Sequence, residues 1–393
     1  MTVTVPRAAS AVALVAAAAL TLSACSSDKK STSTSSSAPA ASDPHTVTIT
    51  ITADGCAPTP TTYNAGGLTF KVTNKDATAV SEVELLSGER IVGEKENLPP
   101  GLSGSFALSL NPGEYTVYCP GAKTEKNTIK ITGTAVSTAA NDSSALLAQG
   151  TTEYANYVNT QVAALLSAVQ ALDAALKGSD LTDAQNAYKK ARVFYERIEP
   201  VAESFTNGDD NLDADIDARA DDVPVDQLTG FHRIEYGLFA QNSLTGLATF
   251  GDGLVTNVQK LQTLTKDLKY QPAELANGAV ELLDEVAKSK ITGEEERYSH
   301  IDLLDFSGNV EGAEQAFACL QPGLAKIDAA LSNEVATAFT ALDALLDKYR
   351  STTDASGYQL YGTLNDADRT AFSQAVQAVS EPLSTVAGKV VGS

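Results

Sequence analysis

Residues 152–176 read TEYANYVNTQVAALLSAVQALDAAL, and this stretch decides the fold of the C-terminal part of the chain. Its apolar residues recur at intervals of mostly three and four, which is the period of one face of an α-helix. They are Tyr154, Tyr157, Val162, Leu165, Val169, Leu172 and Leu176. We therefore predict an amphipathic helix that starts near Asp142 and ends near Gly178.

The helical period continues to the C-terminus. A second helix is predicted after Thr182, a good N-cap residue, and runs through AQNAYKKARVFYERIEPVAESF at 184–205. No segment in this part of the chain has the alternation of a sheet, so residues 142–393 are predicted to form an all-α bundle. The remaining helices are expected around residues 228–241, 252–268, 272–288, 302–320, 324–349 and 365–389.

Upstream of the helices the period changes to two. Apolar and polar residues alternate in VTITIT, LTFKVTN, SEVELL, GSFALSL, GEYTVYC and NTIKITG, and Gly/Pro/Asn turn signals separate these segments. We predict a β-sandwich of roughly seven short strands over residues 45–133. The stretch PGEYTVYCP at 112–120 is similar to the last hairpin of a cupredoxin. A blue-copper centre is excluded, because the domain has one histidine, His45, and the protein's only methionine is Met1.

The N-terminus has the pattern of a secretion signal. Arg7 precedes an apolar run at 8–22, and the sequence Leu-Ser-Ala-Cys then ends at Cys25. This order resembles the lipobox of bacterial lipoproteins, in which the cysteine is lipidated and becomes the first mature residue. We predict a signal peptide over residues 1–24 and a Ser/Ala/Thr/Pro-rich disordered tether over 25–44. A plain secretion signal that leaves Cys25 free is the alternative.

The balance of charge limits the partners of the mature chain. The formal net charge is −21, which argues against binding to nucleic acid or to anionic lipid surfaces. It suits a cationic ligand. No second apolar run is long enough to cross a bilayer, so the predicted lipid is the only membrane attachment.

Acidic residues cluster in the second predicted helix. Placed at 100° per residue, Glu196, Glu199 and Glu203 form a band beside the apolar stripe, where they repel each other unless a cation neutralises them. Pro200 leaves the carbonyl of Glu196 without its helical donor and is expected to kink the helix between the first two acids. The alternative is ordinary surface ion pairing of these acids with Arg192 and Arg197.

A histidine and a glutamate share one face of the predicted central helix. The stretch GFHRIEYGLF places His232 and Glu235 at i and i+3, the spacing of metal-binding helix bundles. A core histidine bonded to its neighbour is the alternative. A third acidic cluster, GEEERYSHIDLLDF, strengthens the metal interpretation. It supplies Glu294, Glu295, Glu296, His300, Asp302 and Asp305.

Two cysteines of the predicted sandwich, Cys56 and Cys119, have two interpretations. Outside the cytoplasm a pair in a small domain is most often a disulfide, worth about 2–4 kcal/mol. The alternative is a mixed thiolate and carboxylate metal site that also uses Glu82 or Glu84, which lie two apart on one strand face.

The combination of a lipoprotein signal, a degenerate cupredoxin domain, and the motifs YERIEPVAESF, IDAR, GFHRIEYGLF and SGNVEG resembles the EfeO-type iron-uptake proteins. Their C-terminal half is an imelysin-like domain with a His-x-x-Glu motif, also classified as peptidase M75. The resemblance implies an extracytoplasmic lipoprotein, in the periplasm or cell-wall space, that binds iron and delivers it to a membrane permease. It also implies a partner, a Dyp-type haem peroxidase.

Matched by motif, the resemblance implies a metal site in the helical domain. Its residues are Glu196, Glu199, Asp217, His232, Glu235 and one of Glu295 or Glu296. In the sandwich it implies a second metal site at Cys56, Cys119 and Glu82 or Glu84. Oxygen donors with one imidazole suit iron, with zinc or copper as alternatives.

Two other functions compete with iron carriage. One is a metallopeptidase of the imelysin class. An inverted zincin motif, His-x-x-Glu-His, needs a second histidine directly after Glu235, where this chain has Tyr236, and only His300 is available to replace it. The other is a non-catalytic adhesion lipoprotein in which the acidic clusters are surface ion pairs. We expect a metal-binding transport component and no enzyme.

Overall fold

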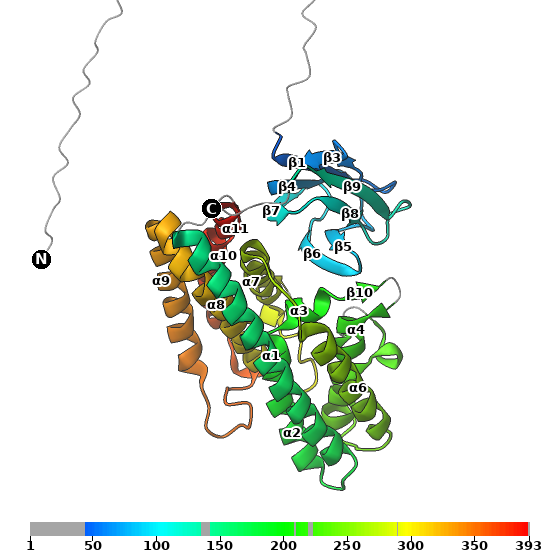
Figure 1. The fold of residues 1–393 in the computed structure, drawn as a ribbon. Coiled ribbons are helices and arrows are strands. Elements are labelled where there is room, and N and C mark those ends of the chain that lie inside the picture. Colours follow the sequence, from blue (N-terminus) through cyan, green and yellow to red (C-terminus); the bar gives the residue numbers. More distant parts are fainter. Residues whose placement is uncertain (1–43, 135–141, 208–209, 219–222, 289, 392–393) are drawn as a thin grey trace, which may run out of the picture. The chain divides into compact units, whose positions relative to one another are not determined.

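The computed structural model describes residues 44–134, 142–207, 210–218, 223–288 and 290–391. Strands occupy the first of these ranges and helices occupy nearly all of the rest (Figure 1). The predicted fold class, a β-sandwich followed by an all-α bundle, is confirmed. The predicted signal peptide, most of the tether and Cys25 lie outside the described residues.

The strands form two sheets that enclose one apolar core. Alternation places Val47, Ile49 and Ile51 of the first strand on the buried face, and Phe70 stacks on Phe106 with ring centroids 4.7 Å apart. One sheet has the order β2 (Pro58–Thr59), β1 (Thr46–Ile51), β4 (Gly66–Asn74), β7 (Ser103–Leu110). The other has the order β3 (Thr62–Asn64), β9 (Lys126–Thr132), β8 (Gly113–Tyr118), β5 (Val83–Ser87), β6 (Arg90–Lys95).

The long predicted helix is α1, Asp142–Leu176, and its apolar stripe packs against α2, α6 and α8 (Figure 1). Most of the predicted stripe is fully buried. Over the described range the other α-helices are α2 (Leu181–Glu196), α3 (Glu199–Glu203), α4 (Leu212–Asp217), α5 (Gly230–Glu235), α6 (Ala248–Thr265), α7 (Pro272–Lys288), α8 (Asp302–Ile327), α9 (Ala329–Leu346), α10 (Asp366–Leu383) and α11 (Val386–Val390).

The structure differs from the sequence prediction at several helix ends. The N-cap of α2 is Asp180, not Thr182, because its carboxylate accepts bonds from the first free backbone N–H groups. Helix α8 continues through Pro322 to Ile327, seven residues beyond its predicted end. One short antiparallel pair, β10 (Thr206–Asn207) with β11 (Asp210–Asn211), interrupts the otherwise helical region.

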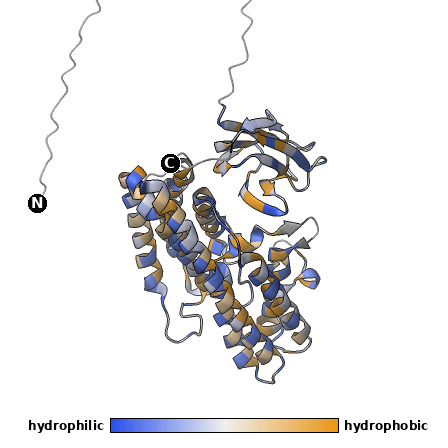
Figure 2. Cartoon of the chain, viewed as in Figure 1, coloured by the Kyte–Doolittle hydropathy of each residue, from blue (hydrophilic) through white to orange (hydrophobic). Residues whose placement is uncertain are grey.

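Polar and apolar residues are mixed along the helices of the bundle (Figure 2). Helices such as α1 and α9 have one face for the core and one for water, whereas the first turns of α8 are buried on all sides. Among the described residues, no helix combines the length and the apolar character that a bilayer span requires.

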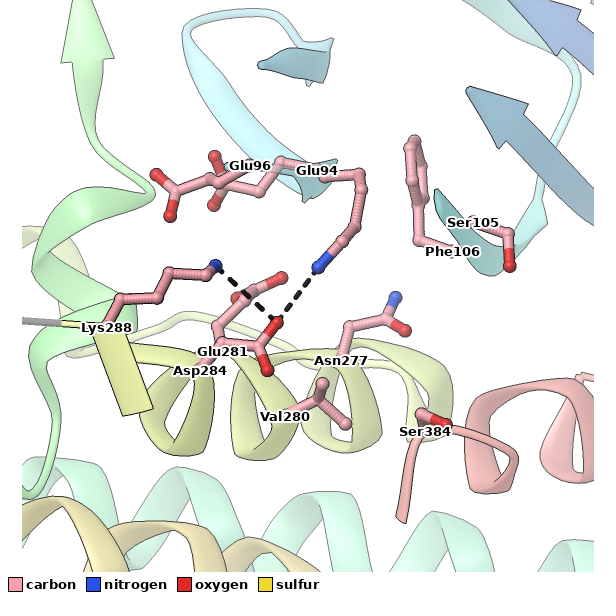
Figure 3. A pocket seen from close by; sticks show the side chains of 11 residues that line it. Glu94, Glu96, Ser105, Phe106, Asn277, Val280, Glu281, Asp284, Lys288 and Ser384 are labelled. Atoms are coloured by element: carbon pink, nitrogen blue, oxygen red, sulfur yellow. Dashed lines mark hydrogen bonds and ion pairs between the residues drawn. The ribbon is translucent and has the colours of Figure 1, made fainter. Parts of the chain in front are cut away.

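Ion pairs connect the sandwich to the bundle at the exposed side of α7. The Lys95 ammonium of β6 lies 2.9 Å from a carboxylate oxygen of Asp284, and Lys288 lies 3.9 Å from the same oxygen (Figure 3). Arg90 contacts Glu274 at 3.4 Å. These side chains are partly exposed, so each pair contributes about 0–1 kcal/mol.

Candidate metal centre

The first acidic residues of the centre lie at a break in a helix. Helix α2 ends at Glu196 and α3 begins at Glu199, with Pro200 in its first turn. The predicted interruption between the two acids is therefore present. The carbonyl of Glu196 accepts a bond of 2.9 Å from the Asn309 side-chain amide, which replaces the donor that Pro200 lacks. The same amide lies 3.2 Å from the Glu196 carboxylate and 3.1 Å from that of Glu199.

Two glycines of the SGNVEG motif allow α8 to approach this break closely. A Cβ atom at Gly308 would lie 2.5 Å from the Glu196 Cβ, and one at Gly312 would lie 2.4 Å from the Arg197 carbonyl oxygen. No larger residue fits at these contacts. The close approach brings Asp305 and Asn309 of α8 to the carboxylate of Glu196.

A third glycine joins the histidine to the IDAR segment. Gly230 has φ of +52°, and a Cβ there would lie 1.7 Å from the Ile216 carbonyl oxygen. The backbones of α4 and α5 therefore meet directly. As a result His232 Nε2 lies 3.3 Å from Asp217 Oδ1 and 3.7 Å from Glu295 Oε1.

Glu235 faces the other nitrogen of the same imidazole. Its Oε2 lies 3.3 Å from His232 Nδ1, and its Oε1 accepts backbone N–H bonds from Tyr298 at 2.7 Å and Ser299 at 2.8 Å. The two side chains of the His-x-x-Glu pair therefore do not converge on one point. Glu235 fixes the ring, and Nε2 faces the other acids. Directly after Glu235 the helix widens into a π-helical turn, Tyr236–Ala240, a distortion frequent at functional sites.

Ligand-type atoms gather in two buried groups that share one residue. Asp217, His232 and Glu295 form the first, and Glu196, Glu295 and Asp305 form the second, with the atoms of each group within 4.8 Å of one another. Glu296 lies to one side, because Tyr188 donates to it at 2.7 Å and the Ser299 hydroxyl also donates to it. The geometry thus selects Glu295 from the adjacent pair. A third group, Glu199, Glu203 and Asp213, lies next to the second.

Arg192 lies inside this centre. Its guanidinium is fully buried and contacts Glu196 and Asp217, and it lies 2.9 Å from both Glu296 and Asp305. The alternative prediction that Arg192 pairs with these acids at the surface is therefore wrong, because its ion pairs are buried. Arg197 pairs instead with Glu311, away from the centre.

Lys290 is the second buried cation. It belongs to a short 3₁₀ turn, Lys290–Thr292, that follows α7, and its side chain is fully buried. Its ammonium lies 2.6 Å from Glu196 Oε2 and 2.7 Å from Glu199 Oε2. The sequence does not predict a site role for Lys290 or Asp305, or an internal position for Arg192.

Negative charge exceeds positive charge in the described part of the centre. The buried basic groups are Arg192, Lys290 and His232, and the buried acids that surround them are Glu196, Glu199, Asp217, Glu235, Glu295, Glu296, Asp302 and Asp305. Such an excess cannot stay ionised in a dry interior without a further cation or bound protons.

The pKa values of these groups follow from burial and from the cations. Burial raises the pKa of Glu196 well above its ordinary value, although Arg192 and Lys290 oppose the shift. Burial also raises the pKa of Asp302 to about 7. For Asp217 the effect of burial is outweighed by Arg192 and His232, which hold its pKa below the ordinary value.

The donor set fits a hard metal ion. Asp217 Oδ2 and Asp305 Oδ1 are buried and have no hydrogen-bond partner, and the closest contact of the buried His232 Nε2 is Asp217 Oδ1 at 3.3 Å. Each is an atom type that ligates metals, and a cation bound at these two groups of ligand-type atoms, which share Glu295, would offset the excess charge. Carboxylate oxygens with one imidazole nitrogen suit iron. A closed structural zinc site would instead contain mainly cysteine and histidine.

The sandwich does not assemble the mixed cysteine and carboxylate site. Cys56 and Cys119 are bonded to each other as a disulfide in the apolar core. Glu84 pairs across the sheet with Tyr118, and because successive side chains of a strand alternate, Cys119 points to the opposite face. Of the two interpretations of the cysteines, the structure contains the disulfide. Glu82, which directly precedes β5, is not in any of the described groups of ligand-type atoms.

His300 does not complete a peptidase site. Its side chain is exposed, its φ is +59°, and it belongs to none of the described groups of ligand-type atoms. The second histidine that the inverted zincin motif requires is therefore not supplied by this residue.

Comparison with known proteins places the chain in a family. The family model of imelysin matches residues 150–386, and that of the cupredoxin-like domain matches residues 12–130. The protein named "Iron uptake system component EfeO" from Escherichia coli O157:H7 is 39% identical over 339 residues, or 85% of this chain and 88% of that protein. The chain belongs to the EfeO family. The EfeO proteins of Escherichia coli K12 and of Shigella flexneri are each 38% identical over the same shares.

The EfeO relatives are named as components of iron uptake systems, which is not an enzymatic role. The imelysin model also carries the peptidase M75 name. The two names suggest different functions, so the function of the acidic centre has to be inferred from its geometry.

Proposed function

We propose that this chain is the extracytoplasmic, lipid-anchored metal-binding component of an iron-uptake system. It binds iron in the buried centre of the bundle and delivers it to a membrane permease, with a Dyp-type haem peroxidase as a partner. Cys25 carries the lipid. The cargo is iron, with copper or zinc as the competing metals.

The observation that supports this proposal most strongly is the set of buried ligand atoms without hydrogen-bond partners. Asp217 Oδ2 and Asp305 Oδ1 face a centre that already holds an excess of carboxylates. A protein core normally satisfies such atoms, so their presence in two groups that share Glu295 favours a cation as the missing partner. The names of the EfeO relatives favour iron as that cation.

The geometry favours different roles for the predicted site residues. The proposed ligands are those of the two groups that share Glu295, namely Asp217, His232 Nε2, Glu196, Glu295 and Asp305. Glu199 lies at the edge of the centre, where Lys290 contacts it. Glu235 positions His232, and Glu296 is held by Tyr188 and Ser299.

Metal binding by variants of the mature chain tests the proposal. Iron content is measured by elemental analysis and by titration for the wild type, Glu196→Ala and His232→Ala. Both variants are expected to lose bound iron, because each removes a ligand and leaves buried charges without partners.

Matched controls are available for both substitutions. His300→Ala removes an exposed histidine, and Glu294→Ala removes the half-exposed acid beside Glu295, which pairs only with Arg297 in the described contacts. Both controls should keep the wild-type iron content. Unchanged iron in Glu196→Ala and His232→Ala would disprove the site assignment, and proteolysis that is abolished by a chelator would favour the peptidase.

A further inference from the structure

The ammonium of Lys290 occupies the kind of position that a metal ion takes. It lies 2.6 Å from Glu196 Oε2, 2.7 Å from Glu199 Oε2 and 3.8 Å from Glu295 Oε1, and the residue is only 1% exposed. A lysine is almost never buried so completely unless it is paired. Here one positive charge lies among three carboxylates.

The ammonium competes for the lone pairs that a metal would use. Glu196 belongs to a group of ligand-type atoms with Glu295 and Asp305, and Glu199 to the neighbouring group. A multivalent cation bound to Glu196 would also repel the ammonium at short range. Lys290 and a metal ion cannot both hold the same oxygen atoms of Glu196.

Arg192 and Lys290 differ in how firmly they are held. Arg192 lies within α2, and its planar guanidinium bonds several carboxylates at once, so it cannot leave without breaking the helix packing. Lys290 lies in a three-residue turn outside any α-helix, on a flexible four-carbon stem. Of these two cations, Lys290 is the one that can move away.

We propose that Lys290 is a resident counter-ion that the incoming metal displaces. In the metal-free chain it offsets the repulsion between Glu196 and Glu199 and keeps the centre folded. On loading, the metal takes over these carboxylates and Lys290 swings out toward solvent. The lysine thereby lowers the affinity of the centre, which suits a protein that must release its cargo. This inference rests on the proposed iron-binding function.

Affinity measurements test this role. Iron, and gallium as a redox-inert trivalent probe, are titrated into the wild type, Lys290→Met and Lys288→Met. Lys288 is the matched control, because it lies two residues earlier, carries the same charge and points to Asp284 (Figure 3). Lys290→Met should bind at least tenfold more tightly than the wild type, since its competitor is gone, and Lys288→Met should stay within about twofold. An affinity of Lys290→Met that equals or falls below the wild-type value overturns the proposal.

A second measurement uses the wild-type chain and does not depend on the folding of a variant. Lysine acetylation followed by mass spectrometry should leave Lys290 unmodified in the metal-free chain and modify it in the loaded chain. Protection of Lys290 in both states would overturn the displacement. A wild-type chain that binds neither iron nor gallium would instead overturn the proposed function itself, which the titration distinguishes.

Discussion

His232 has an acid on each side of its ring. Glu235 faces Nδ1, while Asp217 and Glu295 face Nε2. A carboxylate behind a ligating imidazole fixes the orientation and the protonated nitrogen of the ring. The backbone N–H groups of Tyr298 and Ser299 hold Glu235 in turn. This chain of contacts favours a positioning role for Glu235 over the ligand role expected from the sequence.

Replacing Glu235 by glutamine tests this role. The glutamine oxygen can still accept the two backbone N–H groups, but its amide nitrogen now donates toward Nδ1. The neutral ring must then carry its proton on Nε2, which blocks ligation. We expect Glu235→Gln to weaken metal binding by about 10–100-fold without changing the stoichiometry, as measured by calorimetric titration. A lost equivalent of metal, as in His232→Ala, would identify Glu235 as a ligand.

Sequence patterns could identify this centre only in part. Helical spacing placed His232, Glu196 and Glu199 on inner faces, because it is a local property. It could not choose between Glu295 and Glu296, which are neighbours in an irregular segment; the contacts of Tyr188 and Ser299 decide that. No sequence pattern indicated that Lys290 belongs to the centre, because its burial depends wholly on tertiary packing.

At the scale of elements, breaks and close contacts position the ligands. Pro200 separates α2 from α3, and Asn309 of α8 satisfies the carbonyl that this break releases. The break could be predicted, because proline acts on its own helix. That Asn309 bonds the Glu196 carbonyl could not be predicted. Asn309 lies more than a hundred residues away in the chain and reaches the break only because glycines allow α8 to approach. Those glycines are Gly308 and Gly312.

Because α8 and α2 are in such close contact, one added methyl group at Gly308 should destabilise the fold. In Gly308→Ala the new Cβ would overlap the Glu196 Cβ, so the helices must separate, at a cost of about 1–3 kcal/mol, and the affinity for metal should fall. Gly253→Ala in α6 is the control, since nothing lies within 4 Å of its Cβ position. That control should stabilise the chain by about 0.5–1 kcal/mol. Urea unfolding measures both, and equal stabilities would disprove the close contact.

The outer face of β5 and β6 predicts a dependence of stability on pH. Burial raises the pKa of Glu84 to about 8, and Glu82 and Glu96 add to the shift while Lys126 opposes it. Glu94 lies directly opposite on β6. The folded chain therefore keeps a proton between about pH 4.5 and 8 that the unfolded chain has released. The free energy of unfolding must fall as pH rises through this window.

Glu84→Gln should remove the part of that decline that is due to Glu84, while other buried acids such as Glu281 and Asp302 keep their own parts. Relative to the wild type, we expect the variant to gain about 1–3 kcal/mol between about pH 6 and pH 9, measured by urea unfolding at both values. Glu114→Gln, an exposed acid on β8 of the same sheet, is the control and should follow the wild-type curve. A Glu84→Gln variant that declines like the wild type would show that Glu84 is ionised in the folded chain.

At the scale of the molecule, the described residues have two separate apolar cores, one in the sandwich and one in the bundle. Their order along the chain could be predicted, because the change from a period of two to a period of 3.6 is visible in the sequence. The ion pairs between the two cores could not be predicted, since Lys95 and Asp284 lie far apart in the chain. Being partly exposed, these pairs couple the cores only weakly.

Each core contains one stabilising feature of its own, so each should respond to a different reagent. The disulfide joins two cysteines that lie 63 residues apart in the sandwich, and the proposed metal centre lies in the bundle. We expect two calorimetric transitions. Reductant, applied to the metal-free chain, should remove about 2–4 kcal/mol from the sandwich alone and lower its Tm by roughly 10 °C or more. Iron at about 100 times its Kd should add about 2.7 kcal/mol to the bundle alone and raise its Tm by about 5–10 °C. A single transition that both reagents shift would show instead that the two cores unfold as one cooperative unit, coupled by the Ile91–Ser204 backbone bond and by Ala107 of β7, which packs in the bundle core, as well as by the ion pairs.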